Sequence, residues 1–213
     1  NDGEVVSTDK YTPLSFYNKL WGYDLNNDYV LVMNDPSREY YKVYQIEYDR
    51  HTYDGHDWVY LNLPNEEVKP MLIASLKDST AMYISCDVNK FLNRQKGVMD
   101  LKNFDYESLL GVTMTMDKKE RIITHASASS HAMTLIAVDI DKATSKPTKW
   151  MVENSWGKEN GFKGNYIMTD EWFNEYMFRF VLNKKYVPES VAKLLKQKPI
   201  KLPAWDPMFA PEE

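Results

Sequence analysis

The residues best suited to chemistry are a histidine, an asparagine and a tryptophan in the second half of the chain. His131 precedes an apolar stretch, and Asn154 and Trp156 lie within a Glu-Asn-Ser-Trp-Gly sequence further along. An imidazole serves as base for a thiol nucleophile when a third group fixes its tautomer and ring plane. The hydrogen bond between the imidazole and this third group is stronger when another side chain shields it from water. We therefore expect His131 to be the base, Asn154 its orienting partner and Trp156 the shielding side chain.

The thiol that such a pair serves is expected outside this chain. In papain-type proteases the catalytic cysteine lies about 130–150 residues before the histidine and asparagine. Counting back from His131 leads close to Asn1 or before it. We interpret the chain as the second half of an enzyme whose N-terminal, cysteine-bearing half is missing here.

The single cysteine, Cys86, is predicted to be a small core residue. A reactive protease thiol is expected at a helix N-terminus, with glycines and a tryptophan around it. Cys86 instead lies in an Ile-Ser-Cys-Asp-Val sequence that is typical of a buried strand. The carboxylate of Asp87 would disfavour a thiolate beside it. We therefore do not expect Cys86 to be the nucleophile.

Each remaining histidine has a simpler interpretation. A histidine beside a core strand, such as His131, is by itself more often structural, and Asn154 by itself could belong to an ordinary turn. The two residues indicate a catalytic site only when they are considered together. His125 lies in a small polar segment and is predicted to be on the surface. His51 and His56 flank a predicted hairpin turn with no cysteine nearby, which argues against a zinc site. We expect neither a metal nor an organic cofactor.

Composition excludes several classes of protein. With 213 residues and 43% hydrophobic content, the chain can bury a core, and one globular domain is expected. A formal charge of −5 gives no basic surface for nucleic acid. The longest apolar runs fall well short of the ~20 residues of a membrane-spanning helix, so no membrane partner is expected. No signal peptide can be recognised. A cytoplasmic location is expected, although a single cysteine does little to distinguish a cytoplasmic protein from a periplasmic or secreted one.

Hydrophobic periodicity and turn signals predict an α+β fold with mostly antiparallel strands and flanking helices. Residues 1–12 are predicted to be a flexible linker, 13–198 the folded part, and 199–213 an extended, proline-rich arm on the surface or in a groove. Helices are expected after Thr12, from Asn65, after Asp117, near 170–173 and after Pro188. Asp117 is expected to form a capping box with Glu120. Pro70 is expected either to kink the helix that begins at Asn65 or to mark a later start for it. Strands are expected at 29–33, 42–48, 58–63, 81–88, 132–139, 150–153, 165–168 and 177–182.

Several motifs together resemble the bleomycin hydrolase or aminopeptidase C family of papain-like cysteine peptidases over nearly the whole chain. They are residues 34–36 (Asn-Asp-Pro), 86–90 (Cys-Asp-Val-Asn-Lys), 130–133 (Ser-His-Ala-Met), 149–157 (Lys-Trp-Met-Val-Glu-Asn-Ser-Trp-Gly), 168–173 (Met-Thr-Asp-Glu-Trp-Phe) and 202–208 (Leu-Pro-Ala-Trp-Asp-Pro-Met). Papain-like proteases at large share only the Asn-Ser-Trp-Gly sequence. The other motifs are specific to this branch.

The resemblance implies the C-terminal lobe of a papain-like fold, in which His131 is the general base and Asn154 orients it. It places the nucleophilic cysteine in the missing half and matches Cys86 to a cysteine that is not the nucleophile. It also implies homo-oligomers and a C-terminal arm, here residues 209–213, that lies in the active-site cleft. The carboxylate of Glu213 would there meet the α-ammonium of a peptide substrate.

Two functions follow from these observations. In the first, the chain is part of a cysteine aminopeptidase that hydrolyses N-terminal residues from peptides, inactive without its other half. In the second, it is a pseudoenzyme that retained the half-fold for peptide binding or assembly. The presence of both His131 and Asn154 favours the first. In either case, the apolar surface facing an absent lobe is expected to promote dimers or higher oligomers.

Overall fold

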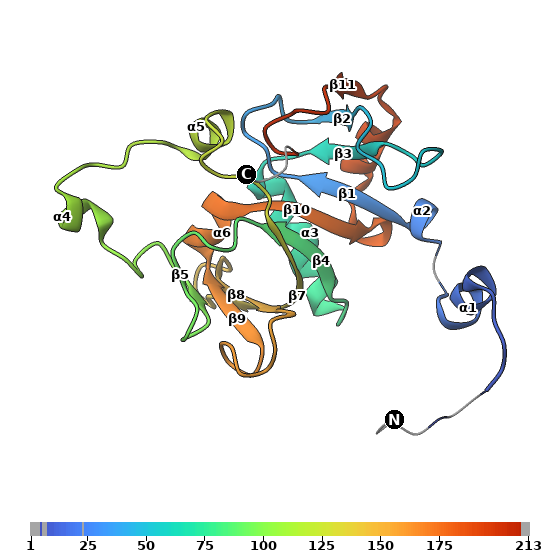
Figure 1. The fold of residues 1–213 in the computed structure, drawn as a ribbon, viewed down its shortest axis with the longest axis horizontal. Coiled ribbons are helices and arrows are strands. Elements are labelled where there is room, and N and C mark those ends of the chain that lie inside the picture. The colour runs from blue at the N-terminus through green and yellow to red at the C-terminus, as the bar shows by residue number, and fades with distance from the viewer. Residues whose placement is uncertain (1–4, 6–7, 23, 210–213) are drawn as a thin grey trace.

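A computed structural model describes residue 5, residues 8–22 and residues 24–209. In this part of the chain, one sheet of 11 strands forms the body, in the order β11-β2-β3-β1-β10-β4-β7-β8-β9-β6-β5 (Figure 1). The strands are β1 (Tyr29–Met33), β2 (Lys42–Ile46), β3 (Trp58–Asn62), β4 (Met82–Cys86), β5 (Leu92–Asn93), β6 (Val98–Met99), β7 (His131–Ile140), β8 (Pro147–Glu153), β9 (Asn165–Thr169), β10 (Met177–Asn183) and β11 (Ile200–Leu202).

Helices and 3₁₀ turns connect and cover these strands, and the predicted α+β class is confirmed. They are α1 (Pro13–Leu20), α2 (Leu25–Asp28), α3 (Asn65–Lys77), α4 (Tyr106–Leu110), α5 (Lys118–Ile123), α6 (Asp170–Tyr176), η1 (Lys184–Tyr186), α7 (Glu189–Ala192) and η2 (Lys193–Lys196). Pairing is antiparallel along most of the sheet. The pairs β1–β3, β2–β11 and β6–β9 are parallel.

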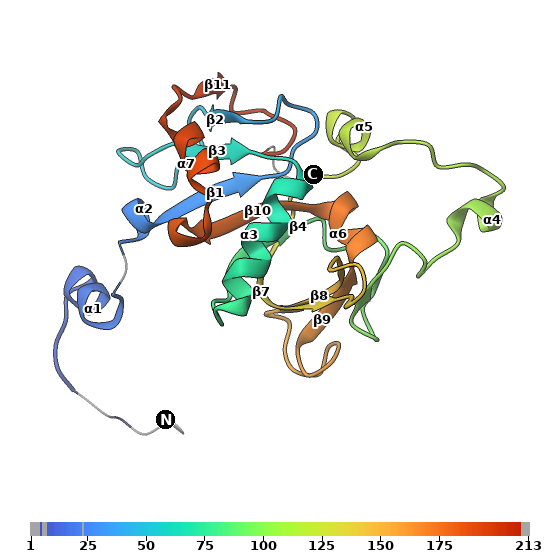
Figure 2. The ribbon, with the colours of Figure 1, turned by 180° about the vertical axis from the view of Figure 1, so that it is seen from behind.

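The two faces of the sheet carry separate hydrophobic clusters, because alternate residues of a strand point to opposite faces. Val32 and Leu61 belong to the larger cluster, whereas their neighbours Met33 and Tyr60 belong to the smaller one. Helices α3 and α7 lie over the face of the larger cluster (Figure 2). The smaller cluster includes Met208, so the C-terminal segment covers part of the other face.

Helix α3 begins at Asn65, as its sequence predicts, and has no side-chain cap. Pro64 is the N-cap residue and provides no side-chain hydrogen bond, so Asn65 is the first residue of the helix. Pro70 lies inside the helix, which continues to Lys77. Val68 and Leu72 are buried against the sheet. Burial of this face stabilises the helix although Pro70 lacks an N–H group.

Other differences from the predictions concern short elements and boundaries. Strand β2 ends at Ile46 rather than Tyr48, because Tyr48 has a positive φ of 68° that strand geometry does not allow. The helix after Pro188 divides into α7 and η2. The sequence did not predict the short elements α2, α4, β5 and β6. The predicted capping box of Asp117 and Glu120 is confirmed at α5.

The predicted arm at 199–213 is partly a strand. Residues 200–202 form β11, which pairs with β2 at the edge of the sheet. Residues 210–213 of the arm, and residues 1–4, 6 and 7 of the predicted linker, lie outside the described part.

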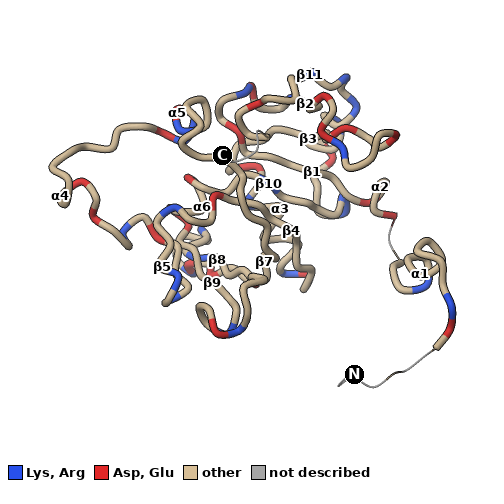
Figure 3. Tube along the Cα trace, in the orientation of Figure 1, with Lys and Arg blue, Asp and Glu red and all other residues tan. Residues whose placement is uncertain are grey.

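Charge is mixed along the described chain. Lys and Arg, drawn in blue, are interspersed with Asp and Glu, drawn in red, along the trace of the described residues (Figure 3). No helix among the described residues has both the length and the apolar character needed to span a membrane.

One buried cation connects α5 to the sheet. Lys118 Nζ donates to Asn34 Oδ1 at 2.6 Å, to the carbonyl oxygen of Met177 at 2.6 Å and to that of Asn174 at 3.0 Å. The ammonium also lies 4.7 Å from the centre of the Phe178 ring. Burial lowers the pKa of Lys118 to about 7, whereas the three oxygen acceptors favour its ammonium form.

We predict that Lys118→Met lowers the free energy of unfolding by about 2 kcal/mol at pH 7, because three buried acceptors lose their donor. The pKa of Lys118 is lower in the folded chain than the ordinary 10.5, so the unfolded chain binds more protons between the two values. The contribution of Lys118 to stability therefore rises with pH across this window. Urea denaturation of both proteins at pH 7 and at higher pH measures the effect. A stability difference that does not change with pH would contradict it.

Candidate active site

His131 is the first residue of β7, which lies between β4 and β8 in the sheet. The segment before it is fixed by the backbone N–H of Ser130, which donates to the carbonyl oxygen of Cys86 at 3.0 Å. A side chain at the start of a strand projects from the end of the sheet rather than from its middle. The imidazole is consequently only partly buried.

Asn154 directly follows β8 and reaches His131 through the pairing of the two strands. Thr134 of β7 pairs with Glu153 of β8, so the end of β8 meets the beginning of β7. The backbone N–H of Asn154 donates to the carbonyl oxygen of Gly164 at 3.0 Å. Gly157 has a φ of 90°, a conformation that favours glycine and lets the loop turn back after Trp156.

The predicted contact between His131 and Asn154 is present: Nε2 of the ring lies 2.9 Å from Oδ1 of the amide. The backbone N–H of Ser155 donates to the same Oδ1 at 2.8 Å. Because an N–H group can only donate, this second bond identifies the amide atom as the oxygen. Nε2 must then carry a hydrogen and donate it. The lone pair of Nδ1 is left to accept a proton from another group.

Trp156 packs against this pair, as predicted. Its ring centre lies 4.8 Å from that of His131 at an interplanar angle of 41°. The edge of Tyr166 supports the indole from another side, with ring centres 5.8 Å apart. The guanidinium carbon of Arg94 lies 4.1 Å from the centre of the indole ring, a cation–π contact. Neither Tyr166 nor Arg94 was predicted, because nothing in the sequence near Trp156 indicates them.

Asn154 lines an open depression of about 380 Å³ together with Ala132, Thr134 and Glu153. One polar atom at this place has no partner among the described residues. Nδ2 of Asn154 is buried and makes no hydrogen bond there. A buried donor without an acceptor is uncommon in a complete site.

Cys86 is a core residue, as predicted, although the register places it beside the imidazole. Cys86 and His131 are Cα partners in the β4–β7 pair. The thiol is fully buried, and burial, together with the charge of Asp87, raises its pKa well above the ordinary value. The imidazole is hydrogen-bonded to Asn154. Proximity along the sheet therefore does not make Cys86 a reactive thiolate.

The remaining histidines and Glu213 do not contribute to this pair among the described residues. His125 is exposed, as predicted, and so are His51 and His56. Among the described residues, no group of three or more His, Cys, Asp or Glu side chains is arranged to hold a metal ion. Glu213, predicted to bind the substrate amine, lies outside the described residues.

Comparison with protein families and curated proteins gives one consistent match. The model of the Peptidase C1-like family matches residues 1–209. Bleomycin hydrolase of Homo sapiens is 43% identical over 204 residues, which are 93% of this chain and 45% of that protein. Aminopeptidase C of Lactobacillus delbrueckii subsp. lactis is 38% identical over 215 residues, 99% of this chain and 47% of that protein. The chain spans about half the length of these relatives.

Comparison with solved structures agrees. The crystal structure of pepw from Lactobacillus rhamnosis superposes with a TM-score of 0.89 at 34% sequence identity. The match covers 94% of this chain and 46% of that one.

We predict that the neutral ring of His131 is held as the Nε2–H tautomer and that Asn154→Ala releases it into a mixture of tautomers, because the acceptor of Nε2–H is removed. Long-range proton–nitrogen correlation spectra of the imidazoles report the tautomer. The exposed His125 serves as an internal reference whose spectrum should stay the same. An unchanged His131 tautomer in Asn154→Ala would show that the amide does not orient the ring.

Proposed function

Because the chain belongs to the Peptidase C1-like family, we propose that it supplies the base and the orienting amide of a cysteine aminopeptidase. The family resemblance predicted from the motifs is confirmed, and so is the papain-like α+β fold. The observation that carries the proposal is the hydrogen bond of 2.9 Å between His131 and Asn154. It leaves Nδ1 of the imidazole as an acceptor at the end of the sheet where β7 begins.

In the proposed reaction, Nδ1 of His131 takes the proton of a cysteine thiol, and the resulting thiolate attacks the first peptide carbonyl carbon. The imidazolium then gives its Nδ1 proton to the leaving amine as the carbon–nitrogen bond breaks, which leaves a thioester. Water, deprotonated by the same nitrogen, hydrolyses the thioester and restores the thiol. Asn154 Oδ1 accepts the Nε2–H bond throughout, and Trp156 keeps that bond from water.

We propose that the nucleophile lies outside these 213 residues. Cys86 is the single cysteine in the sequence, and its buried thiol with a raised pKa is unsuited to attack. The relatives are about twice as long as this chain. The unpartnered Nδ2 of Asn154 is consistent with a site that further residues complete.

The substrates we propose are peptides cleaved after their first residue, since aminopeptidases are among the relatives. Phe209, the last described residue, lines the same cavity as Ser129, which lies two positions before His131. Phe209 therefore lies close to the beginning of the strand that carries the proposed base. We propose that Glu213 there pairs with the α-ammonium of the substrate.

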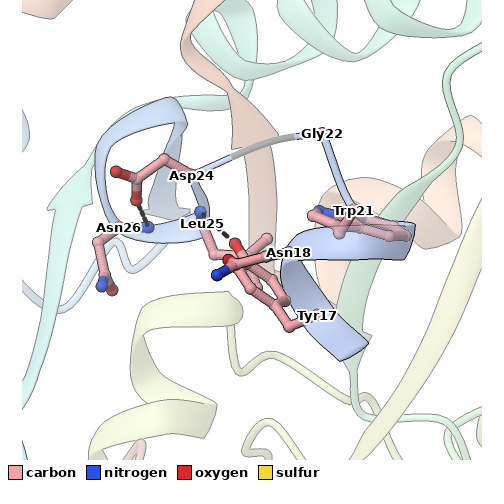
Figure 4. A pocket seen from close by; sticks show the side chains of 7 residues that line it. All are labelled: Tyr17, Asn18, Trp21, Gly22, Asp24, Leu25 and Asn26. Atoms are coloured by element: carbon pink, nitrogen blue, oxygen red, sulfur yellow. Dashed lines mark hydrogen bonds between the residues drawn. The ribbon is translucent and has the colours of Figure 1, made fainter. Parts of the chain in front are cut away.

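Two exposed apolar surfaces point to further protein partners. The first is the α4 arm, residues 103–117, which extends far from the body (Figure 1). Its exposed apolar side chains are Phe104, Tyr106, Leu109, Leu110, Val112, Met114 and Met116. The second surrounds α1, which buries no residue, and includes a pocket of about 520 Å³ lined by Tyr17, Trp21 and Leu25 (Figure 4). We propose that other parts of the assembled enzyme cover both surfaces.

A chimera tests the proposed function. The matching region of Lactobacillus delbrueckii aminopeptidase C is replaced by this chain, and hydrolysis of an aminoacyl coumarin amide is measured. We predict that the chimera is active and that His131→Ala lowers its rate about a thousandfold or more. The chain alone should be inert.

Two control variants define the roles in the chimera. His125→Ala and Cys86→Ala should retain activity that iodoacetamide abolishes. Turnover by the chain alone that is sensitive to iodoacetamide would place the nucleophile at Cys86 and contradict the proposal. A folded but inactive chimera would favour a non-catalytic binding module instead.

We also predict that the chain by itself forms dimers or larger oligomers through the α4 arm. Replacing Leu109 and Leu110, which are 77% and 61% exposed, by Ser should shift it toward the monomer. Light scattering at high concentration measures the molar mass, with Leu20→Ser on α1 as the comparison variant. A wild-type chain that stays monomeric, or an effect confined to Leu20→Ser, would contradict this prediction.

A further inference from the structure

The segment that leads into His131 has no regular secondary structure, yet its three serines are buried or partly buried. Residues 124–130 connect α5 to β7 (Figure 1). Ser127 is 4% exposed, and Ser129 and Ser130 are partly buried. The proposed reaction uses none of these hydroxyl groups. Because the segment ends at the base, whatever fixes the segment also fixes the point from which the imidazole projects.

Two side-chain hydrogen bonds attach this segment to the end of β4 and to the residue that follows it. Ser127 Oγ donates to Oδ2 of Asp87 at 2.7 Å. The hydroxyl of Ser129 is hydrogen-bonded to the hydroxyl of Ser85. Both bonds add to the backbone hydrogen bond that the residue before His131 donates to β4. The segment is therefore held against the strand that pairs with β7.

Asp87 is itself buried and fixed. It is 6% exposed, and its backbone N–H donates to the carbonyl oxygen of Tyr176 at 3.0 Å. The ammonium of Lys90 lies 3.8 Å from the carboxylate, which is further away than the Ser127 hydroxyl. A buried carboxylate that loses a hydrogen-bond donor is destabilised. Asp87 therefore favours the path of the chain in which Ser127 reaches it.

The beginning of β7 depends on such support because pairing on its two sides starts at different residues. On one side, His131 is already the partner of Cys86 in the β4–β7 pair. On the other side, pairing with β8 begins only at Thr134. A shift of the first residues of β7 would move the imidazole away from Asn154 and lengthen their hydrogen bond of 2.9 Å. The contacts of the preceding segment oppose that shift.

We propose that Asp87 and Ser127 are positioning residues that align the imidazole of His131 with the amide of Asn154. The proposal deepens the proposed function and rests on it for the role of His131 as a base. The alignment itself can be measured in the chain alone, because it requires neither a nucleophile nor a substrate. Failure of the positioning and failure of the proposed function are therefore separate results.

The chain offers a matched control pair in another place. Ser37 Oγ donates to Oδ1 of Asp35, whose side chain is fully buried. Asp35 follows β1, which is separated from β7 by β10 and β4. Ser37→Ala removes the same kind of hydrogen bond but leaves the segment before His131 intact. It controls for the loss of a buried hydrogen bond as such.

The first test records long-range proton–nitrogen correlation spectra of the imidazoles in the full chain. We expect Ser127→Ala to replace the single Nε2–H tautomer of His131 by a mixture, because the ring is no longer held against its acceptor. Ser37→Ala should leave the tautomer as in the wild type. Ser129→Ala removes the second side-chain bond and keeps the test possible if Ser127→Ala does not fold.

The second test measures activity in the chimera with aminopeptidase C. Ser127→Ala should lower kcat at least about tenfold, because a small misplacement of a catalytic group slows the reaction. KM should stay within about twofold, since no contact with the substrate is removed. Asp87→Asn is the conservative variant. It keeps an oxygen that can accept the Ser127 bond, so it should retain the Nε2–H tautomer and most of the activity.

Two results would overturn the proposal. Folded Ser127→Ala and Ser129→Ala proteins that keep the wild-type tautomer would show that the segment does not align the ring. A mixture of tautomers in Ser37→Ala as well would show that general loosening of the chain is the cause. An inactive wild-type chimera would contradict the proposed function, whereas the spectra of the chain alone would still decide the positioning.

Discussion

The pairing register of β7 and β8 is the constraint on which the candidate site depends. It brings Glu153 opposite Thr134 and so delivers Asn154 to the beginning of β7, where its amide oxygen accepts the Nε2–H bond of His131 at 2.9 Å. A slip by one residue would turn every side chain of the strand to the opposite face. The antiparallel partners β4 and β9 hold this register on either side. The geometry of the candidate site is thus a consequence of backbone hydrogen bonding across the sheet.

The C-terminal segment up to Phe209 is an integral part of the fold. Strand β11 extends the sheet beyond β2, and Met208 is buried in the smaller cluster. Asp206, only 1% exposed, forms an ion pair with Arg38. Removal of Arg38 would leave the buried carboxylate of Asp206 uncompensated, which favours this one path of the chain. The segment is therefore anchored before Phe209, whose ring contacts the guanidinium of Arg179.

Two groups at this end of the sheet could react, a thiol and an imidazole. They differ in reactivity because one is buried and the other is only partly buried. Cys86 and His131 face each other across β4 and β7. The thiol is enclosed by the core, which raises its pKa and keeps it neutral. The imidazole at the strand's first position is only partly buried, and its Nε2 is hydrogen-bonded to Asn154. The same sheet therefore leaves the imidazole partly exposed and buries the thiol.

The sequence by itself determined the local elements and the chemical identity of the site. A run of apolar residues that ends before Asn34 defined β1 at its observed bounds, and Asp117 with Glu120 defined the start of α5. His131, Asn154 and Trp156 stood out by residue type. These signals act between residues close in the chain. Tertiary structure alone decided that Arg94 stacks on Trp156, that residues 200–202 join the sheet beside β2, and that Arg179 meets Phe209. Such contacts join residues distant in sequence, and only packing of the whole chain determines which of them meet.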